Sequence, residues 1–255
     1  MPTNTSSIQL AGKLQCCVII PTYNNALTLQ SVIDSVMHYV GDVIVVNDGA
    51  TDETSDILAT NSKVTVIDYH PNRGKGYALK KGFKYAAGKG FKYAITIDSD
   101  GQHLAIDIGL FLDKIQQYPH SLIVGSRILR QANMPGGNTF ANRFSNFWYR
   151  LQTGINLPDT QSGFRLYPLD KITTMHFVTS RYESELEMLV RAAWKGINII
   201  SVPISVYYPP PGERVSHFRP FIDFFRITIL NTFLTLIALV VIYPAKGISK
   251  LLQIR

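Results

Sequence analysis

Short apolar runs alternate with segments of helical periodicity along this chain, and this alternation restricts its fold more than any other feature. Runs with the length of buried strands lie at 16–24, 42–48, 63–69, 93–98 and 121–127. Helical segments are predicted at 29–40, from about 54, and at 76–88, 107–118 and 183–196. Such alternation predicts an α/β fold in which helices cover both faces of a mostly parallel sheet.

Polar residues follow three of the predicted strands at the point where each strand ends. They are Thr22–Asn24, Asn47–Asp48 and Asp98–Asp100. Ligands in parallel sheets bind beyond the carboxyl ends of the strands. We therefore expect these three segments to meet at one edge of the sheet and to form the functional site.

The stretch YAITIDSDGQH, residues 93–103, ends an apolar strand in two carboxylates. Carboxylates repel each other and are costly to desolvate unless a cation lies between them. An Asp-x-Asp pair alone is a weak signal, because surface turns often contain one. At the end of a buried strand, and followed by Gln102, it predicts a Mg²⁺ or Mn²⁺ site that includes substrate phosphates. The predicted metal ligands are Asp98, Asp100 and Gln102.

A glycine pair, Gly74 and Gly76 in NRGKGYA, follows the third predicted strand. A dinucleotide fold would need its glycine-rich turn after the first strand, where this chain has PTYNNA, and no Walker loop is found. The glycines either form an ordinary loop or open a helix whose free amides, with Lys75, face an anion.

The chain is basic, with a net charge of +7 and a pI near 9.3, so its expected partners are anionic. Its Lys and Arg residues are scattered, which argues against nucleic acid and favours lipid phosphate or an anionic membrane. The adjacent Cys16 and Cys17 are expected to be core residues with no disulfide or metal role. The N-terminal segment lacks a long apolar core, so no secretory signal is expected.

The ordered motifs VIIPTYNN, VIVVNDGATDET, NRGKGYALKKG, TIDSDGQH, GSR and TQSGFRLYP resemble those of family 2 glycosyltransferases with the GT-A fold. The closest subgroup is the dolichol- or polyprenyl-phosphate hexosyltransferases, typified by dolichol-phosphate mannose synthase. The resemblance covers about residues 15–218. It implies inverting, metal-dependent transfer of a hexose from a nucleotide sugar, of the GDP-mannose or UDP-glucose type, to a polyprenyl or dolichyl phosphate.

The resemblance also implies roles for individual residues. The predicted donor-binding residues are Pro21, Thr22, Tyr23, Asn24, Asp48, Lys75, Asp98 and Ser99. Asp48 would contact base or ribose, and Asp100 would bind the metal through the diphosphate. This chain has Asn25 where the family often has Glu, Asn47 where it usually has an acid, and Ala50 where it usually has Ser. The resemblance therefore does not determine which nucleotide base the donor carries.

Charge decides between possible acceptors. A hydroxyl acceptor needs a general base, for which Glu183 and Glu185 are the candidates. A phosphate acceptor is already ionised, with a second pKa of about 6, and needs cations instead. Arginine forks match phosphate oxygens, and the predicted catalytic residues beside Asp100 are Arg127, Arg165 and Arg214. A non-catalytic sugar-nucleotide-binding membrane protein is a further alternative, against which the intact acid set argues.

The C-terminal part of the chain is strongly apolar. Residues 227–243 carry no charge over a length close to the lower limit of about 17 for a membrane-spanning helix. The preceding FRPFIDFFR mixes aromatics with arginines, as interfacial helices do. We expect a flexible segment at 1–14, a catalytic domain at 15–218 and a membrane-associated tail at 219–255, on the cytoplasmic face because its flanks are basic. The alternative is a core helix.

Overall fold

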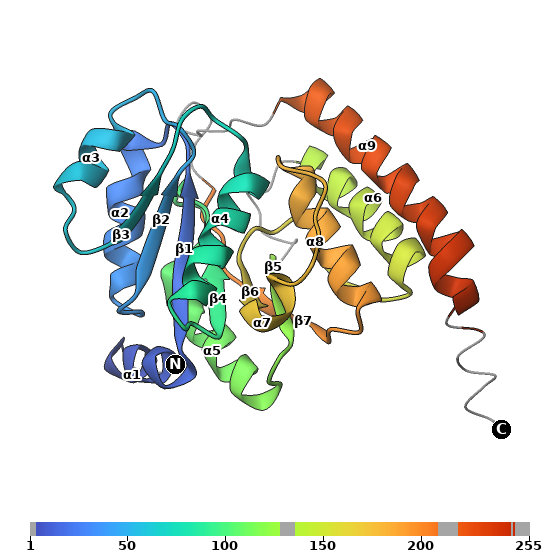
Figure 1. Cartoon of the computed structure of the whole chain (residues 1–255), viewed down its shortest axis with the longest axis horizontal. Helices are drawn as coiled ribbons and strands as arrows, with labels where there is room; N and C mark the ends of the chain where they lie inside the picture. Colours follow the sequence, from blue (N-terminus) through green and yellow to red (C-terminus); the bar gives the residue numbers. More distant parts are fainter. Residues whose placement is uncertain (1–3, 128–135, 209–218, 246, 248–255) are drawn as a thin grey trace.

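The computed structural model describes residues 4–127, 136–208, 219–245 and 247, and it confirms the predicted α/β architecture (Figure 1). Seven strands form one sheet, in the order β3-β2-β1-β4-β6-β5-β7. The strands are β1 (Cys16–Thr22), β2 (Val43–Asn47), β3 (Thr65–Asp68), β4 (Tyr93–Thr96), β5 (Leu122–Arg127), β6 (Arg165–Pro168) and β7 (Ile199–Ile204).

Helices cover both faces of the sheet. They are α1 (Asn4–Leu14), α2 (Ala26–Met37), α3 (Thr54–Thr60), α4 (Lys75–Gly88), α5 (Ile108–Gln117), α6 (Gly136–Thr153), α7 (Leu169–Ile172), α8 (Glu183–Trp194) and α9 (Pro220–Ile237). A 3₁₀ turn, η1 (Ala105–Asp107), precedes α5, and a π-helical turn, η2 (Ala238–Ile242), continues α9.

The sheet is mostly parallel, as predicted, but β6 runs antiparallel to both of its neighbours, β4 and β5. Sequence periodicity did not predict β6, because the strand has only four residues, begins with Arg165 and ends with Pro168. Its insertion places the segment before it, residues 159–164, close to the carboxyl end of β4: the Thr96 hydroxyl donates to the Gly163 carbonyl at 2.7 Å.

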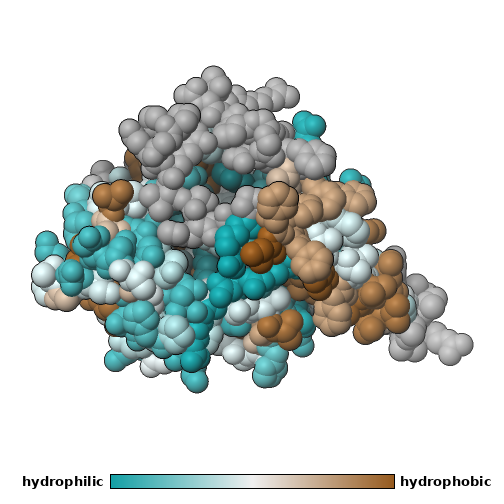
Figure 2. All heavy atoms as spheres, turned by 90° about the horizontal axis from the view of Figure 1, so that it is seen from above, coloured by the Kyte–Doolittle hydropathy of each residue, from teal (hydrophilic) through white to brown (hydrophobic). Residues whose placement is uncertain are grey.

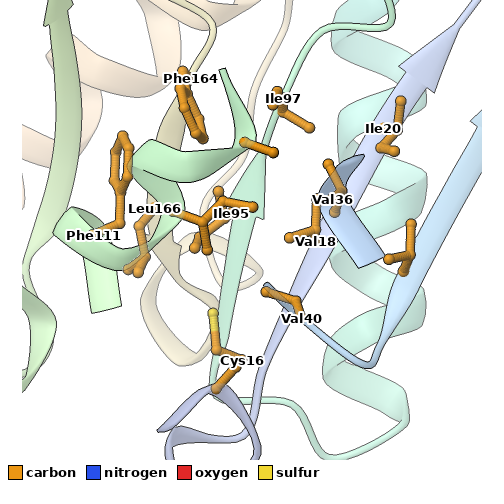
Figure 3. Packing of buried hydrophobic residues seen from close by; sticks show 14 of the residues in the cluster. Cys16, Val18, Ile20, Val36, Val40, Ile95, Ile97, Phe111, Phe164 and Leu166 are labelled. Carbon is orange, nitrogen blue, oxygen red and sulfur yellow. The ribbon is translucent and has the colours of Figure 1, made fainter. Parts of the chain in front are cut away.

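The first strand shows why the sheet is buried on both faces. Cys16, Val18 and Ile20 point to the side of α2 and α5 (Figure 3), whereas Cys17 and Ile19 belong to the core on the side of α4 and α8. Alternate residues of a strand point to opposite faces, so a continuous apolar run is required when both faces are covered. Both cysteines are free, and both are buried core residues, as their apolar surroundings in the sequence predict.

The N-terminal segment, expected to be flexible, is instead a helix that contacts α5 and β1. Its buried side has helical spacing: Ser7 and Ala11 are buried, and Leu10 and Leu14 pack against the core below α2. This spacing of three and four residues is the sequence signal that predicts an amphipathic helix. The sequence interpretation noted only that the segment lacks a long apolar core and did not use this spacing, so the expected flexibility is replaced by a helix.

The C-terminal helix α9 is packed along α8 and α6 (Figure 1). Leu230 and Leu234 are buried in the core on the side of α4. The Gln152 amide of α6 donates to the carbonyl and side-chain oxygens of Asn231, at 3.1 and 3.0 Å. The packed core therefore continues past residue 218, where the sequence-based domain boundary was placed.

We predict that α9 contributes to the stability of the whole domain. Leu234 is fully buried, so Leu234→Ala should lower the free energy of unfolding by about 2–5 kcal/mol, the usual cost of a core cavity. Leu236, on the same helix, is 56% exposed, and Leu236→Ala should change stability by no more than about 0.5 kcal/mol. Urea unfolding in mild detergent measures both. Equal, small effects would show that α9 is not part of the cooperative unit.

Candidate active site

A cavity of about 720 Å³ opens at the carboxyl ends of β1, β2 and β4, the edge expected from the sequence. Most of the predicted donor-binding and metal-binding residues line it: Pro21, Thr22, Tyr23, Asp48, Lys75, Asp98, Ser99, Asp100 and Gln102. Asn24 is not among the lining residues, and Asn25 takes its place. The Asn24 side chain accepts from the Thr51 backbone amide at 2.7 Å and so joins two loops at the rim.

Lys75 lies at the centre of the charged groups in this cavity. Its Nζ is 2.7 Å from Asp98 Oδ1 and 2.8 Å from Glu185 Oε2. Although burial lowers the pKa of Lys75, Asp98 and Glu185 raise it above its usual value, so the ammonium stays charged. Lys75 thus joins the end of β4 to the first turns of α4 and α8.

The two glycines around Lys75 allow this arrangement. Gly74 has a φ of 97°, which strongly favours glycine, and a Cβ there would lie 2.5 Å from Arg181 Cγ. At Gly76 a Cβ would collide with the Ser184 side chain of α8. The glycine pair therefore permits close packing of α4 against the 180–184 segment, which brings Lys75 to Glu185.

Asp98 was predicted to be a metal ligand, but its nearest cation is Lys75. Burial raises the pKa of Asp98, and the positive charges around it, Lys75 foremost, together more than reverse this, so that the net shift is downward. The sequence interpretation looked for a divalent ion between the two acids because it could not show that a lysine 23 positions earlier in the chain reaches the same point.

Asp100 differs from Asp98 in forming no ion pair with any residue of the described segments. Its Oδ1 accepts from the Gln102 backbone amide at 3.0 Å, and burial together with the charge of Asp98 raises its pKa to about 6. A buried carboxylate in this state favours a cation or a proton. Asp100 and Gln102 supply oxygen atoms of the kind that Mg²⁺ and Mn²⁺ prefer.

No group of three or more His, Cys, Asp or Glu side chains in the described part of the chain could enclose a metal ion by itself. A site with few protein ligands is usual for Mg²⁺, which binds through one or two carboxylates and completes its shell with substrate phosphates and water. The donor set around Asp100 fits an ion of that kind and not a closed structural site.

Asp48, predicted to contact base or ribose, holds the loop before α4. Its Oδ1 accepts from the Arg73 amide at 2.7 Å, and its Oδ2 accepts from the Gly74 amide at 2.8 Å and the Asn72 side chain at 2.9 Å. These bonds fix the wall of the cavity between β2 and α4. The predicted donor contact of Asp48 stays a prediction.

Ser99, between the two acids, is tied to α2. The Asn25 amide donates to the Ser99 hydroxyl at 2.8 Å, and the Thr28 hydroxyl donates to the Ser99 carbonyl at 2.6 Å. Gly101 follows with a φ of 73°, which turns the chain so that Gln102 also lines the cavity. The Asp98–Gln102 turn is therefore held in place by α2.

Arg165 does not have the predicted role in binding an acceptor phosphate, because its side chain is fully buried. Its guanidinium donates to the backbone carbonyls of Glu185 at 2.6 Å, Ser162 at 2.7 Å and Thr160 at 2.9 Å. These bonds join β6 to α8 and to the segment before β6. Arg165 is a structural residue that positions Glu185.

Arg127 is also engaged within the protein. Its Nε and Nη2 donate to the two carboxylate oxygens of Asp159 at 2.6 and 3.1 Å, and Asp159 is fully buried. Arg127 is not among the residues that line the cavity, so the structure gives no support for contact with an acceptor. Arg214, the third predicted arginine, lies outside the described residues.

Sequence reasoning missed Pro71, Asn72 and Ala78 in the cavity wall, and four further residues from the C-terminal half of the chain. Arg181 and Tyr182 precede α8, whereas Arg219 and Asp223 come from the start of α9. The segment around Arg219 was interpreted only as an interfacial helix. The sequence signal for this part of the wall was a carboxylate between two arginines inside an apolar segment. Asp223 is only 1% exposed, and its Oδ2 accepts from the Arg219 backbone amide at 2.7 Å.

Comparison with protein families gives a match to the model for "Glycosyl transferase family 2" over residues 17–173. A UDP-N-acetylglucosamine–dolichyl-phosphate N-acetylglucosaminyltransferase of Methanococcus voltae is 31% identical, over 75% of this chain and 85% of that protein. A polyprenol monophosphomannose synthase of Mycolicibacterium smegmatis is 28% identical, over 74% of this chain and 76% of that protein. An undecaprenyl-phosphate mannosyltransferase of Micrococcus luteus is also 28% identical, over 78% of this chain and 86% of that protein.

Solved structures with a similar fold include glucosyl-3-phosphoglycerate synthase from Mycobacterium tuberculosis. Its complex with Mn²⁺, uridine diphosphate and phosphoglyceric acid aligns with a TM-score of 0.66 at 18% identity, over 93% of this chain and 83% of that one. Its complex with Mg²⁺ and uridine diphosphate aligns with a TM-score of 0.64 at 20% sequence identity, with the same coverage of both chains. At this identity the likeness concerns the fold, which is the GT-A fold.

We predict that Lys75→Gln destabilises the protein by about 3–5 kcal/mol at neutral pH, because it leaves buried carboxylates without their cation. Lys75 lowers the pKa of Asp98, so the stabilisation is present above the unfolded pKa near 4 and is lost as the pH falls below it. The difference between variant and wild type should therefore shrink on acidification. Denaturant unfolding at pH 7 and at about pH 3, below the unfolded pKa, measures this.

The matched control is Lys84→Gln, an identical change of charge at an exposed position of α4. It should have little effect at either pH. A loss of stability in Lys75→Gln that does not change with pH would contradict the role given to the ion pairs and would indicate a loss of packing alone.

Proposed function

The chain belongs to glycosyl transferase family 2 and is a glycosyltransferase, and on this premise we propose that it transfers a hexose from a nucleotide sugar to a polyprenyl or dolichyl phosphate. The observation that carries the proposal is the cavity at the strand ends, in which Asp100 has no ion-pair partner among the described residues. The names of three relatives at 28–31% identity support the choice of acceptor, since each contains a polyprenyl or dolichyl phosphate or its glycosylated product.

The cavity is large enough for the donor, since small-molecule sites usually measure about 300–1,000 Å³. We place the nucleoside between Pro21–Tyr23 and Asp48, and the diphosphate near Asp100 and Gln102. Donors of the GDP-mannose and UDP-glucose types both fit this scheme.

Asp100 and Gln102 are the residues that would hold Mg²⁺ or Mn²⁺. Support comes from the raised pKa of Asp100 and from the ions in the structures of similar fold. The ion supplies charge that stabilises the departing nucleoside diphosphate. The charge of Asp98 beside this position favours a cation there, and the Lys75 ammonium offsets only part of it.

A phosphate acceptor fits the chemistry of this site. An ionised phosphate oxygen forms the new bond to the anomeric carbon, and the electron pair of the old bond leaves with the nucleoside diphosphate. No proton has to be removed, so no general base is needed. Glu185, the base candidate for a hydroxyl acceptor, is engaged by Lys75 at 2.8 Å, which favours the phosphate acceptor.

We further propose that α9 lies in the membrane interface, on the cytoplasmic face. Among the described residues one helix, Phe221–Ala245, is long and apolar enough to span a membrane, with a mean hydropathy of 2.2. Figure 2 shows hydrophobic residues gathered on the side of the molecule where α9 lies, and the exposed apolar residues of α9 include Phe221, Phe224 and Phe225. Because the opposite side of α9 packs on α6 and α8, a helix lying on the membrane fits better than one crossing it.

We predict that Asp100→Asn lowers kcat at least about a hundredfold, equivalent to about 3 kcal/mol of transition-state stabilisation, while the protein stays folded. The substitution keeps the shape of the side chain and removes the charge that would hold the cation. Chelation of divalent ions should inhibit the wild type to a similar degree. Asp56→Asn, at an exposed position of α3, is the control and should keep full activity.

The assay that tests the function incubates membranes containing the protein with radiolabelled nucleotide sugars and polyprenyl phosphate. Label should enter an organic-extractable product that mild acid cleaves. Label that enters only water-soluble products would contradict the lipid phosphate acceptor and favour a hydroxyl acceptor. Full activity of Asp100→Asn would remove the metal from the proposal.

For the membrane contact we predict that Phe221→Ser together with Phe225→Ser shifts the protein from sedimenting vesicles to the supernatant. These side chains are 92% and 65% exposed, and burial of each in lipid is worth about 1.5–3 kcal/mol. Leu27→Ser, an equally exposed apolar position on α2, should leave sedimentation unchanged. Unchanged binding of the double variant would place the membrane contact elsewhere.

A further inference from the structure

A second cavity, of about 380 Å³, lies between the 178–183 segment and α9. Its apolar lining includes Ile229, Leu230 and Phe233, spaced along one side of α9. Its charged lining consists of Arg181, Arg226 and Glu183. A cavity lined by apolar side chains and arginines suits an amphiphile with an anionic head group. The donor and metal sites described above do not involve this cavity.

The two cavities are neighbours. Arg181 lines both of them. Asp223 lines the larger cavity, and its Oδ1 is 3.8 Å from Nη1 of Arg226, which lines the smaller one. The two cavities therefore adjoin at Arg181 and along the first turns of α9.

We propose that the smaller cavity is the binding site of the lipid phosphate acceptor. The first isoprene units lie against Ile229 and Phe233, and the phosphate lies at Arg181 and Arg226, facing the donor cavity. This inference rests on the proposed function, because it specifies where the acceptor of that reaction binds.

The charges support a phosphate at this position. Arg226 Nη1 is buried and has no hydrogen-bond partner among the described residues, and a buried N–H without an acceptor is costly. Asp223, the nearest carboxylate, is shared with Arg219, whose Nη2 is also 3.8 Å away. Arg181 and Arg226 together outnumber Glu183, so the lining of the cavity has a net positive charge that phosphate oxygens would neutralise.

The position of the cavity suits a ligand that comes from the bilayer. Ile229 and Phe233 are about half exposed and continue the apolar surface of α9 that is proposed to contact the membrane. An isoprenoid chain can pass from the lipid phase along this surface into the cavity without exposing its length to water, which the hydrophobic effect opposes. The phosphate then arrives beside the donor while the rest of the chain stays in the bilayer.

The first test fills the cavity. Ile229→Trp should raise the KM for undecaprenyl phosphate at least about tenfold, equivalent to about 1.4 kcal/mol of binding, with the KM for the nucleotide sugar unchanged. Thr232→Trp adds similar bulk at an exposed position of α9 outside the lining of both cavities, and should leave both constants unchanged.

The second test removes the charge. In the wild type, a polyprenyl phosphate of another chain length should compete with undecaprenyl phosphate, the acceptor, at a concentration at least about tenfold lower than the corresponding polyprenol requires. Arg226→Gln should abolish this preference without changing the KM for the nucleotide sugar. Arg150→Gln, at an exposed position of α6, should retain it. Loss of packing alone would not remove discrimination between the two inhibitors.

The outcomes distinguish a failure of the proposed acceptor site from a failure of the proposed function. A wild type that transfers sugar to undecaprenyl phosphate, with Ile229→Trp and Arg226→Gln behaving like their controls, would overturn the acceptor site and leave the proposed function standing. A wild type that transfers sugar only to a hydroxyl acceptor would overturn both. Unchanged nucleotide-sugar binding by each variant, measured by calorimetry, shows that the variant is folded.

Discussion

The ammonium of Lys75, held between Asp98 and Glu185, is the contact on which the arrangement of this cavity depends. It joins three segments that are distant in the sequence: the end of β4, the start of α4 and the start of α8. Burying these three charges separately would cost far more than burying them together. The glycines on either side of Lys75 help to bring the three groups to one point. The buried guanidinium of Arg165, which donates to the Glu185 carbonyl, does the same from the other side.

Much of this site could be predicted from the sequence because strand ends are local features. The runs that end at Thr22, Asn47 and Asp98 could be recognised by their length and composition, and parallel pairing brings their ends together. The partners of charged side chains could not be predicted in the same way. Arg165 looks like a phosphate ligand in the sequence, yet backbone carbonyls surround it, because β6 enters the sheet in the opposite direction. Nothing in four residues signals that direction.

The C-terminal helix shows a second limit of hydropathy as a guide. Residues 227–243 satisfy the criterion for a membrane segment by composition alone. The few polar residues within it carry the missing information: Asn231 and Thr235 are buried, and both receive hydrogen bonds from Gln152 of α6. Such pairs predict a helix with one side packed on protein. Their partners, however, lie about 80 positions earlier in the chain, so the pattern becomes clear only in the folded molecule.

The placement of Arg219 and Asp223 has a kinetic consequence. The helix that brings these side chains to the donor cavity also carries the exposed phenylalanines that we propose to contact the membrane, so a single helix would connect the reaction chamber with the lipid surface. For an enzyme built in this way, encounters with a lipid substrate take place by lateral diffusion in two dimensions. At a saturating concentration of nucleotide sugar, the rate of the proposed reaction then depends on the number of acceptor molecules per unit of membrane area and not on the volume of the surrounding water.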